Sequence, residues 1–323
     1  MTAPATPPSD DSLRLLYLGG IGRSGSTLLE RMLGELPGAC SLGEVAQMWA
    51  RGVRDDERCG CGQAFSACPF WREVGEIAFG GWGTVSVDRM LELRARVDDV
   101  RRTPALLLGA LGRATRRDLE EYTSAYRAVY EAARKVSGAD VIVDSSKFTS
   151  LAYCLRRVPD LDLRLLHLIR DSRAVAYSWT KVVRRPEVVD GESYMHRFRP
   201  ARLAFLWDLH NTLLELPRLA GTPTRTLRYE QFARDPRAVL RDVAAFAGLS
   251  LGPDDLGFLH DGSVELSVSH QVAGNPLRFT TGTVEIRRDD AWRTSLAAGD
   301  RRRVAALTAP VSLAFGYSPF RMR

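Results

Sequence analysis

Short segments rich in aliphatic or β-branched residues recur along this chain, each bounded by polar or glycine-rich stretches. Four of them are predicted to be strands: residues 13–18, 140–143, 163–169 and 224–227. Longer stretches with helical spacing of apolar residues separate these segments, and no internal repeat is visible. Alternating strands and helices predict one α/β domain with a central, mainly parallel sheet, helices on both faces, and a ligand at the carboxyl ends of the strands.

The stretch between residues 71 and 136 is predicted to be helical with loops. Its last part is the clearest, because Tyr122, Tyr126 and Tyr130 recur at a spacing of four residues. This tyrosine stripe is interpreted as core packing; the alternative is that part of it faces a cleft and lines a substrate site. A further helix is predicted at residues 203–219, where leucines share one face.

A glycine-rich loop follows the first predicted strand and leads into a helix. Its glycines are Gly19, Gly20, Gly22 and Gly25. The helix begins near Thr27 and stops at residues 37–38, Pro-Gly. A strand, a glycine loop and a helix N-terminus direct several backbone N–H groups and the positive end of the helix dipole at one point, which predicts an anion-binding site.

Residues 20–27 read G-x-x-x-x-G-S-T, a Walker A pattern in which Ser26 replaces the lysine. That lysine normally bridges the outer phosphates of a nucleoside triphosphate, so its replacement argues against an ordinary NTPase. Arg23 is the one strong cation in the loop. A tight turn of small residues is the alternative interpretation of the loop alone.

The string GGIGRSGSTLLERML resembles the phosphosulfate-binding loop of sulfotransferases that use 3′-phosphoadenosine 5′-phosphosulfate (PAPS). It is most similar to the tyrosylprotein and carbohydrate branch and to bacterial relatives, rather than to the cytosolic aryl branch. The resemblance implies a P-loop-like fold, and it implies that the 5′-phosphosulfate is held by consecutive loop residues: Arg23, Ser24, Gly25, Ser26 and Thr27.

The third predicted strand is followed by RDSRAVAYS, which resembles the 3′-phosphate motif of sulfotransferases. The resemblance implies that Arg170 and Ser178 grip the 3′-phosphate, with Arg170 making charge-assisted hydrogen bonds. A kinase has no use for such a site. His167, inside the apolar strand, is interpreted as a core histidine whose hydrogen bonds are satisfied.

Residues 39–52, ACSLGEVAQMWARG, read as a short strand end, a turn and a helix that starts near Glu44. In the sulfotransferases that the chain resembles, a glutamate about twenty residues after the loop arginine is the general base, and Glu44 has that spacing. An acceptor hydroxyl needs such a carboxylate to take its proton. The alternative is that Glu44 caps the helix.

The second predicted strand ends at Asp144, which imitates a Walker B site and is the strongest argument for a P-loop kinase-like phosphotransferase. Sulfotransferases place a lysine that assists the sulfuryl group near this strand end. Lys147 lies a few positions from the expected place, so the resemblance makes it a third catalytic candidate beside Glu44 and Arg23. A solvated helix start is the alternative.

Two further blocks resemble nucleotide contacts of the family. Tyr229 follows the fourth predicted strand, where the family's tyrosine lies near the adenine; a packed aromatic is the alternative. Residues 270–293 are too polar and glycine-rich for a core element and resemble the loop that closes over the nucleotide, with Arg278 reaching the 3′-phosphate. His270 is a candidate base or a loop hydrogen-bonding residue. Residues 181–199 are predicted to be a mobile loop over the cleft.

Three cysteines, Cys59, Cys61 and Cys68, are close together in sequence, whereas Cys40 and Cys154 are isolated. The C-x-C-x6-C spacing leaves free thiols, one local disulfide and a zinc site open, since no fourth ligand and no neighbouring histidine are visible. The predicted chemistry itself requires no metal.

The composition restricts the class of ligand and the expected compartment but does not identify a ligand. The 323 residues are 45% hydrophobic and 26% charged, and the net charge of +6 suits an anionic ligand. No nucleic-acid-binding motif accompanies the charge. Residues 1–12 are predicted to be a disordered tail without the pattern of a signal peptide, and no run is long enough for a membrane span. We therefore expect a cytoplasmic protein, unlike the membrane-anchored Golgi relatives.

These blocks together predict a single domain over residues 13–323, with a helical insertion at about 71–136 where the resemblance implies that substrate choice resides. The resemblance implies transfer of the sulfuryl group from PAPS to a hydroxyl of a small molecule, a carbohydrate or a similar acceptor. A P-loop kinase-like enzyme and a non-catalytic nucleotide-binding module are the alternatives. The acceptor and the oligomeric state are left open.

Overall fold

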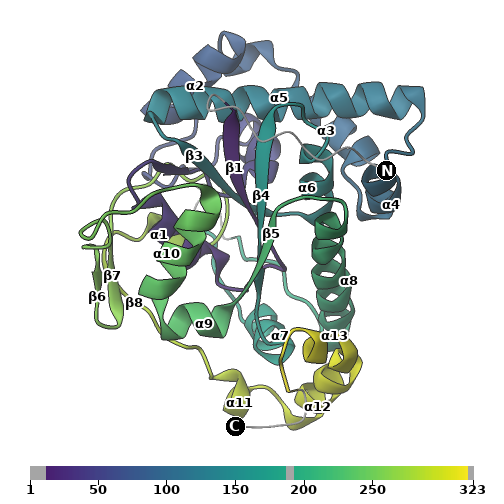
Figure 1. The fold of residues 1–323 in the computed structure, drawn as a ribbon, viewed down its shortest axis with the longest axis vertical. Helices are drawn as coiled ribbons and strands as arrows, with labels where there is room; N and C mark the ends of the chain where they lie inside the picture. Colours follow the sequence, from purple (N-terminus) through teal and green to yellow (C-terminus); the bar gives the residue numbers. More distant parts are fainter. Residues whose placement is uncertain (1–11, 187–192, 319–323) are drawn as a thin grey trace.

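Five parallel strands form the central sheet of the computed structural model, which describes residues 12–186 and 193–318. The strands are β1 (Leu13–Gly19), β2 (Ala39–Ser41), β3 (Val141–Lys147), β4 (Leu161–Ile169) and β5 (Thr224–Arg228). They lie in the order β2-β3-β1-β4-β5, so β1 occupies the centre (Figure 1). The predicted α/β fold with a mainly parallel sheet is confirmed.

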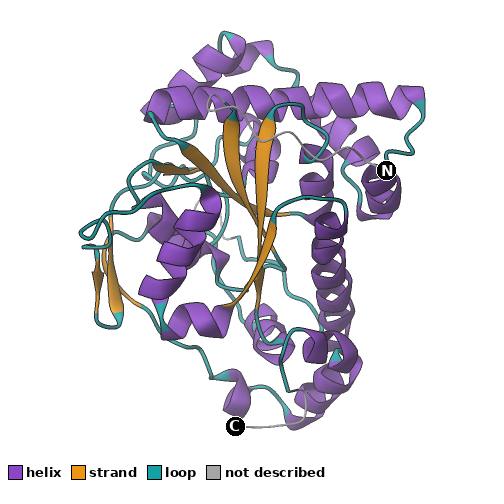
Figure 2. Ribbon diagram, in the orientation of Figure 1, coloured by secondary structure: helices purple, strands orange, loops and turns teal. Residues whose placement is uncertain are grey.

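Both faces of the sheet are buried, as parallel sheets require. Side chains alternate along β1, so that Leu15 and Tyr17 join one hydrophobic cluster and Leu16 and Leu18 join the other. The first face is covered by α5 (Arg113–Ser137), α6 (Thr149–Leu155) and α8 (Pro200–Leu219). The second face is covered by α1 (Ser26–Gly34) and α10 (Pro236–Ala247), and Figure 2 shows the strands between these helical layers.

The region predicted to be helical contains four helices with loops between them. They are α2 (Pro69–Phe79), α3 (Val87–Val97), α4 (Thr103–Leu108) and α5. Tyr122, Tyr126 and Tyr130 are fully buried on α5, where Tyr122 and Tyr126 also share a hydrogen bond. The interpretation of the tyrosine stripe as core packing is therefore confirmed.

A second sheet was not expected. It consists of the antiparallel strands β6 (Leu259–His260), β7 (Ser263–Leu266) and β8 (Gly282–Glu285), and Figure 2 shows it apart from the central sheet. The prediction that residues 270–293 are too polar for the core is wrong for part of this segment, because Gln271, Val272 and Ala273 are buried. Val272 accepts a hydrogen bond from the Glu44 N–H and donates one to Leu42 O.

The remaining helices are α7 (Ser172–Thr180), α9 (Tyr229–Arg234), α11 (Trp292–Ser295), α12 (Ala298–Leu307) and α13 (Ala309–Ala314). Short 3₁₀ helices span Val45–Gln47, Trp82–Thr84, Val100–Arg102 and Pro276–Phe279, and a π-helical turn spans Met48–Arg54. The helix predicted near Glu44 is thus a 3₁₀ turn that continues as a π-helical turn.

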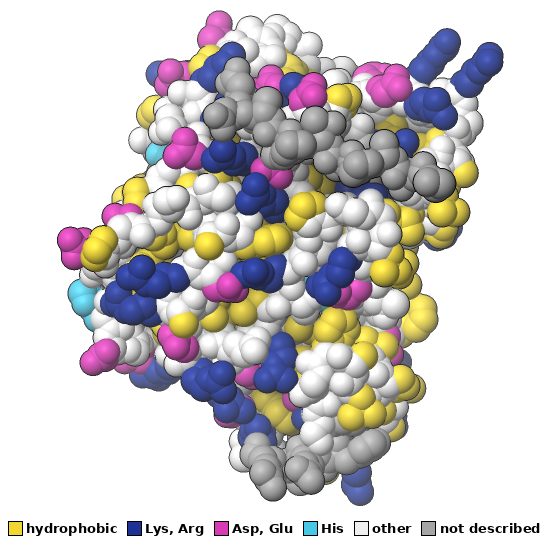
Figure 3. All heavy atoms as spheres, in the orientation of Figure 1, with side chains coloured by type: hydrophobic (Ala, Val, Ile, Leu, Met, Phe, Trp, Pro, Cys, Tyr) yellow, Lys and Arg dark blue, Asp and Glu magenta, His cyan; other side chains and the backbone are white. Residues whose placement is uncertain are grey.

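The predicted tail lies outside the described residues except for Ser12, and so does part of the predicted loop 181–199, at 187–192. The division into one domain with a helical insertion stays a prediction. No helix among the described residues is long and apolar enough to cross a membrane. On the face drawn in Figure 3, Lys and Arg side chains are distributed among Asp and Glu side chains.

Two adjacent buried polar side chains on α1, Glu30 and Arg31, connect distant parts of the fold. Glu30 accepts a hydrogen bond from Gly43 N at 2.7 Å and another from the Ser145 hydroxyl. Arg31 is 1% exposed and donates to four backbone carbonyls, those of Ser267, Leu277, Arg278 and Thr280. Burial raises the pKa of Glu30 to about 8.

The raised pKa of Glu30 predicts a loss of stability with rising pH. Between about pH 5 and 8 the folded chain keeps a proton that the unfolded chain releases, so the free energy of unfolding should fall, by at most about 1.4 kcal/mol per pH unit from this group. Glu30→Gln cannot titrate; its amide oxygen still accepts from Gly43 N, and its NH₂ group can donate to the Ser145 hydroxyl, which then acts as the acceptor. Denaturant unfolding at several pH values should therefore show a shallower fall for this variant.

The exposed Glu73 on α2 supplies the matched control, and Glu73→Gln should leave the pH dependence of unfolding unchanged. Equal slopes for the wild-type chain and Glu30→Gln would contradict a titrating Glu30.

Candidate active site

A pocket of about 820 Å³ opens at the carboxyl ends of the central strands. It collects side chains from the glycine loop, the ends of β3 and β4, α7, α8 and the segment before α8. Its polar and aromatic lining includes Arg23, Ser26, Thr27, Glu44, Lys147, Arg170, Ser178, Trp179, His196, His210 and Asn275. This position agrees with the sheet order, because loops on the two sides of β1 diverge there and leave a crevice.

The loop after β1 has the backbone form of an anion cradle. Arg23 and Gly25 adopt positive φ values of 74° and 91°, and Gly25 is the residue that precedes the first turn of α1. A Cβ atom at Gly25 would lie 2.5 Å from the Tyr229 ring, so only glycine fits. No side chain caps α1 and no acidic residue lies in its first turn, which leaves the helix N-terminus open to an anion.

Arg23 has few strong partners of its own. Its guanidinium donates to the Met195 thioether at 3.0 Å and lies 5.6 Å from the centre of the Trp179 ring. Within residues 12–186 and 193–318 its Nε atom is buried and has no hydrogen-bond partner. Burial lowers the pKa of Arg23, and the charge of Glu44 acts in the opposite direction. The arrangement suits an anionic ligand.

The other loop residues divide into two groups. Ser26 and Thr27 line the pocket at the start of α1. Ser24 does not line it: its hydroxyl is buried and donates to Ile21 O at 2.8 Å. The Ser24 side chain therefore stabilises the conformation of the loop through a hydrogen bond inside it.

Arg170 lies directly after β4 and lines the pocket together with Ser178 of α7. Its guanidinium donates to Arg23 O at 3.1 Å and lies 4.4 Å from the centre of the Tyr229 ring. The Asp289 carboxylate is 3.2 Å from Arg170 and 3.6 Å from Lys181 Nζ. Burial opposes ionisation of Asp289, but the charges of Arg170 and Lys181 lower its pKa.

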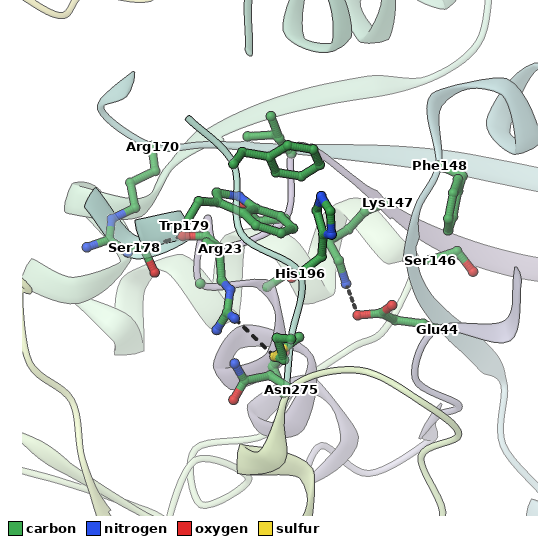
Figure 4. A pocket seen from close by; sticks show the side chains of 18 of the residues that line it. Arg23, Glu44, Ser146, Lys147, Phe148, Arg170, Ser178, Trp179, His196 and Asn275 are labelled. Atoms are coloured by element: carbon green, nitrogen blue, oxygen red, sulfur yellow. Dashed lines mark hydrogen bonds and ion pairs between the residues drawn. The ribbon is translucent and has the colours of Figure 1, made fainter. Parts of the chain in front are cut away.

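Glu44 and Lys147 face each other across the pocket floor. Lys147 Nζ donates to Glu44 Oε1 at 2.7 Å and to Ser145 O at 2.8 Å. Glu44 precedes the 3₁₀ turn at Val45–Gln47, but its side chain accepts no capping hydrogen bond there. Figure 4 shows Glu44 and Lys147 at one end of the pocket, Arg170 and Ser178 at the other, and Arg23 between them.

The structure does not bring Tyr229 and Arg278 to this pocket. Tyr229 is buried, packs under Arg170 and donates to Arg287 O at 2.8 Å, as a packed aromatic would. Arg278 is 1% exposed and donates to Arg58 O at 2.9 Å and to Gly274 O. Its guanidinium holds backbone carbonyls together, so the predicted contact with the 3′-phosphate has no support in this geometry.

Three further residues that the sequence analysis singled out lie outside the pocket. His167 is fully buried between Glu215 and Asn211, which confirms its interpretation as a core histidine. Asp144 is buried and accepts hydrogen bonds from Tyr130 and Ser146 without lining the pocket, and burial raises its pKa to about 6. His270 lies with the cysteines, away from the pocket.

Several pocket residues were missed by the sequence analysis. Trp179 directly follows Ser178 and donates to Gly22 O at 2.9 Å, so its place after the 3′-phosphate motif was an available signal. The others were not singled out as residues. Met195 and His196 lie in the loop 181–199 that was predicted over the cleft, Asn275 lies in the block that resembles the nucleotide-closing loop, and His210 lies on the predicted helix 203–219. His210 shares a 2.8 Å hydrogen bond with Thr149.

Curated relatives match part of the chain. It is 29% identical to carbohydrate sulfotransferase 5 of Mus musculus over 207 residues, which cover 56% of this chain and 49% of the relative. It is 28% identical to carbohydrate sulfotransferase 6 of Homo sapiens over 206 residues, covering 58% and 50%. The chain thus spans about half the length of the curated relatives it matches.

Solved structures share the fold over almost the whole chain. The sulfotransferase domain from the Synechococcus PCC 7002 olefin synthase has a TM-score of 0.50 and 20% identity, covering 98% of this chain and 99% of that one. The sulfotransferase domain from the curacin biosynthetic pathway has a TM-score of 0.50 and 15% identity, covering 96% and 99%. A family model described as the sulfotransferase family matches residues 16–253, which include the glycine loop, Glu44 and the Arg170–Ser178 block, and the chain belongs to that family.

Proposed function

We propose that this chain is an enzyme that transfers the sulfuryl group of PAPS to a hydroxyl of an acceptor and releases adenosine 3′,5′-bisphosphate. The observation that carries the proposal is one pocket in which the buried Arg170 and the partly exposed Arg23 lie beside an uncapped helix N-terminus, with a carboxylate at the other end. Family membership supports the same reaction. The names of the curated relatives favour a carbohydrate among the acceptors that the sequence left open.

The two arginines suit the two charged ends of PAPS. Arg170 donates to the carbonyl of Arg23, so the two side chains are held in one structural unit. Each has a buried Nε without a hydrogen-bond partner among the described residues, and such donors favour an anion. We assign Arg23 with Ser26, Thr27 and the loop N–H groups to the 5′-phosphosulfate, and Arg170 with Ser178 to the 3′-phosphate.

Glu44 is the proposed general base. PAPS supplies an already activated sulfuryl group, and the chain's own contribution is to remove the acceptor proton and to stabilise negative charge near Arg23. Lys147 uses two of its three donors on Glu44 and Ser145, which orients the Glu44 carboxylate. The reaction in this proposal needs no Mg²⁺.

The kinase alternative finds less support in this geometry. A Walker B acid must face the bound metal, whereas Asp144 is committed to Tyr130 and Ser146 inside the core. A binding module without catalysis would not need Glu44 and Lys147 paired in the pocket. We retain both alternatives as outcomes of the experiment below.

Calorimetric titration tests the nucleotide site directly. We expect adenosine 3′,5′-bisphosphate to bind without metal and ATP with Mg²⁺ to bind weakly or not at all. Binding of ATP and Mg²⁺ without binding of the bisphosphate would favour the kinase. Bisphosphate binding without transfer to any acceptor in a broad screen would favour the binding module.

Substitutions at the two ends of the pocket should separate binding from proton transfer. Arg23→Ala should weaken bisphosphate binding by roughly tenfold to a hundredfold, because it removes charge-assisted hydrogen bonds. Glu44→Gln should leave that affinity nearly unchanged and lower kcat by roughly 10²- to 10⁴-fold. Calorimetry and single-acceptor kinetics on both variants measure the two effects.

Arg302→Ala on α12 and Glu73→Gln on α2 are exposed controls and should change neither quantity. Equal loss of nucleotide affinity in Arg23→Ala and Glu44→Gln would contradict the separate roles.

The Asp289 carboxylate competes with any anion that approaches Arg170 and Lys181. Asp289→Asn removes this charge and keeps an acceptor, so we expect the bisphosphate to bind roughly threefold to tenfold more tightly. Calorimetry at low and moderate salt measures the gain. Weaker binding in this variant would show instead that Asp289 positions Arg170 for the ligand.

A further inference from the structure

Four side chains with metal-binding atoms meet at one point outside the active site. Cys59, Cys61 and Cys68 come from one loop, and His270 comes from a segment about two hundred residues later. Their ligand atoms all lie within 4.8 Å of one another. Cys59 and Cys68 are buried, whereas Cys61 and His270 are partly exposed. None of the four lines the active-site pocket.

The separations of these atoms suit a tetrahedral zinc ion. Zn–S bonds of about 2.3 Å and Zn–N bonds of about 2.0 Å imply S–S edges of roughly 3.8 Å and S–N edges of roughly 3.5 Å. Cys61 Sγ lies 3.7 Å from Cys68 Sγ. His270 Nδ1 lies 3.2 Å from Cys68 Sγ and 4.0 Å from Cys59 Sγ, which are values on either side of the expected edge.

We propose that Cys59, Cys61, Cys68 and His270 bind one structural Zn²⁺ ion. Three thiolates and one imidazole form a closed tetrahedral set, the usual ligand set of structural zinc, and leave no open position for a substrate or water. A disulfide would join two of the sulfurs at about 2.05 Å. It would not explain why the third cysteine and His270 lie at the same point.

The surroundings of His270 hold its ring in place. The imidazole stacks on Phe70 with ring centres 5.2 Å apart and an interplanar angle of 12°. The His270 backbone carbonyl accepts a hydrogen bond from Trp71 Nε1 at 2.7 Å. Both aromatic residues follow Cys68 within three positions, so the cysteine loop itself orients the distant ligand.

The bound ion would join two segments that support the active site. Gly60 N donates to Gln271 O at 3.0 Å, and Arg278 donates to Arg58 O, beside the first cysteine. Two residues after His270, Val272 O accepts the N–H of Glu44 at 2.9 Å. The zinc site therefore anchors the segment that holds the backbone of the proposed base.

Metal analysis of the full-length chain tests the proposal independently of sulfuryl transfer. Purified with reductant and without chelator, the wild-type chain should contain one zinc per molecule. Cys59→Ser and Cys68→Ser should each lose it, whereas Cys40→Ser is the matched control outside the cluster and should keep it. A zinc-to-protein ratio near zero in the wild-type chain, even after exposure to Zn²⁺, would overturn the proposal.

Cobalt substitution decides the matter if the cysteine variants do not fold. The wild-type chain reconstituted with Co²⁺ should show a thiolate-to-cobalt charge-transfer band and strong visible bands typical of tetrahedral coordination. His270→Ala should weaken and shift these bands while the chain still binds adenosine 3′,5′-bisphosphate. An absent charge-transfer band, or a Cys61–Cys68 disulfide in peptide mapping of the protein purified with reductant, would refute the site.

Discussion

The buried Glu30–Arg31 pair on α1 is the constraint on which the rest of the site depends. Glu30 holds the backbone just before Glu44 and the end of β3, and Arg31 holds four carbonyls of the segment between Ser267 and Thr280. The short helix α1 thus presents its N-terminus to the ligand, and its next turn holds the loop before Glu44 and the segment between Ser267 and Thr280 through hydrogen bonds. Buried polar groups of this kind are costly unless they are hydrogen-bonded, so the loops and the helix stabilise one another.

Positively charged side chains are distributed along the length of the pocket. Arg170 is held against Arg23 O and the Tyr229 ring, and Arg23 contacts a thioether and an indole face. Two arginines that line one pocket suit an elongated anion with charge at both ends. Lys147 and Glu44 form a neutral pair farther along, which suits an uncharged hydroxyl compound.

Local sequence patterns predicted most of the fold and the glycine loop from which the site is built. The four strands, the tyrosine helix and the glycine loop were visible because each depends on residues close together in sequence. The Lys147–Glu44 pair, the environment of Arg278 and the meeting of His270 with the cysteines depend on contacts across a hundred residues or more. The contact of Arg278 with the 3′-phosphate, which the resemblance implies, stays a prediction; in this structure its guanidinium donates to the backbone carbonyls of Arg58 and Gly274.

The stretch from His270 to Asp289 contacts four separate parts of the molecule in turn. It meets the cysteine cluster first, then the backbone of Glu44, then the carbonyl clamp of Arg31, and finally the guanidinium of Arg170. These four parts are therefore connected by the backbone of one segment and not by a series of side-chain contacts. Because one continuous segment holds both the backbone of Glu44 and the Asp289 partner of Arg170, an intact segment is needed to keep the proposed base and the Arg170 side chain in place relative to each other.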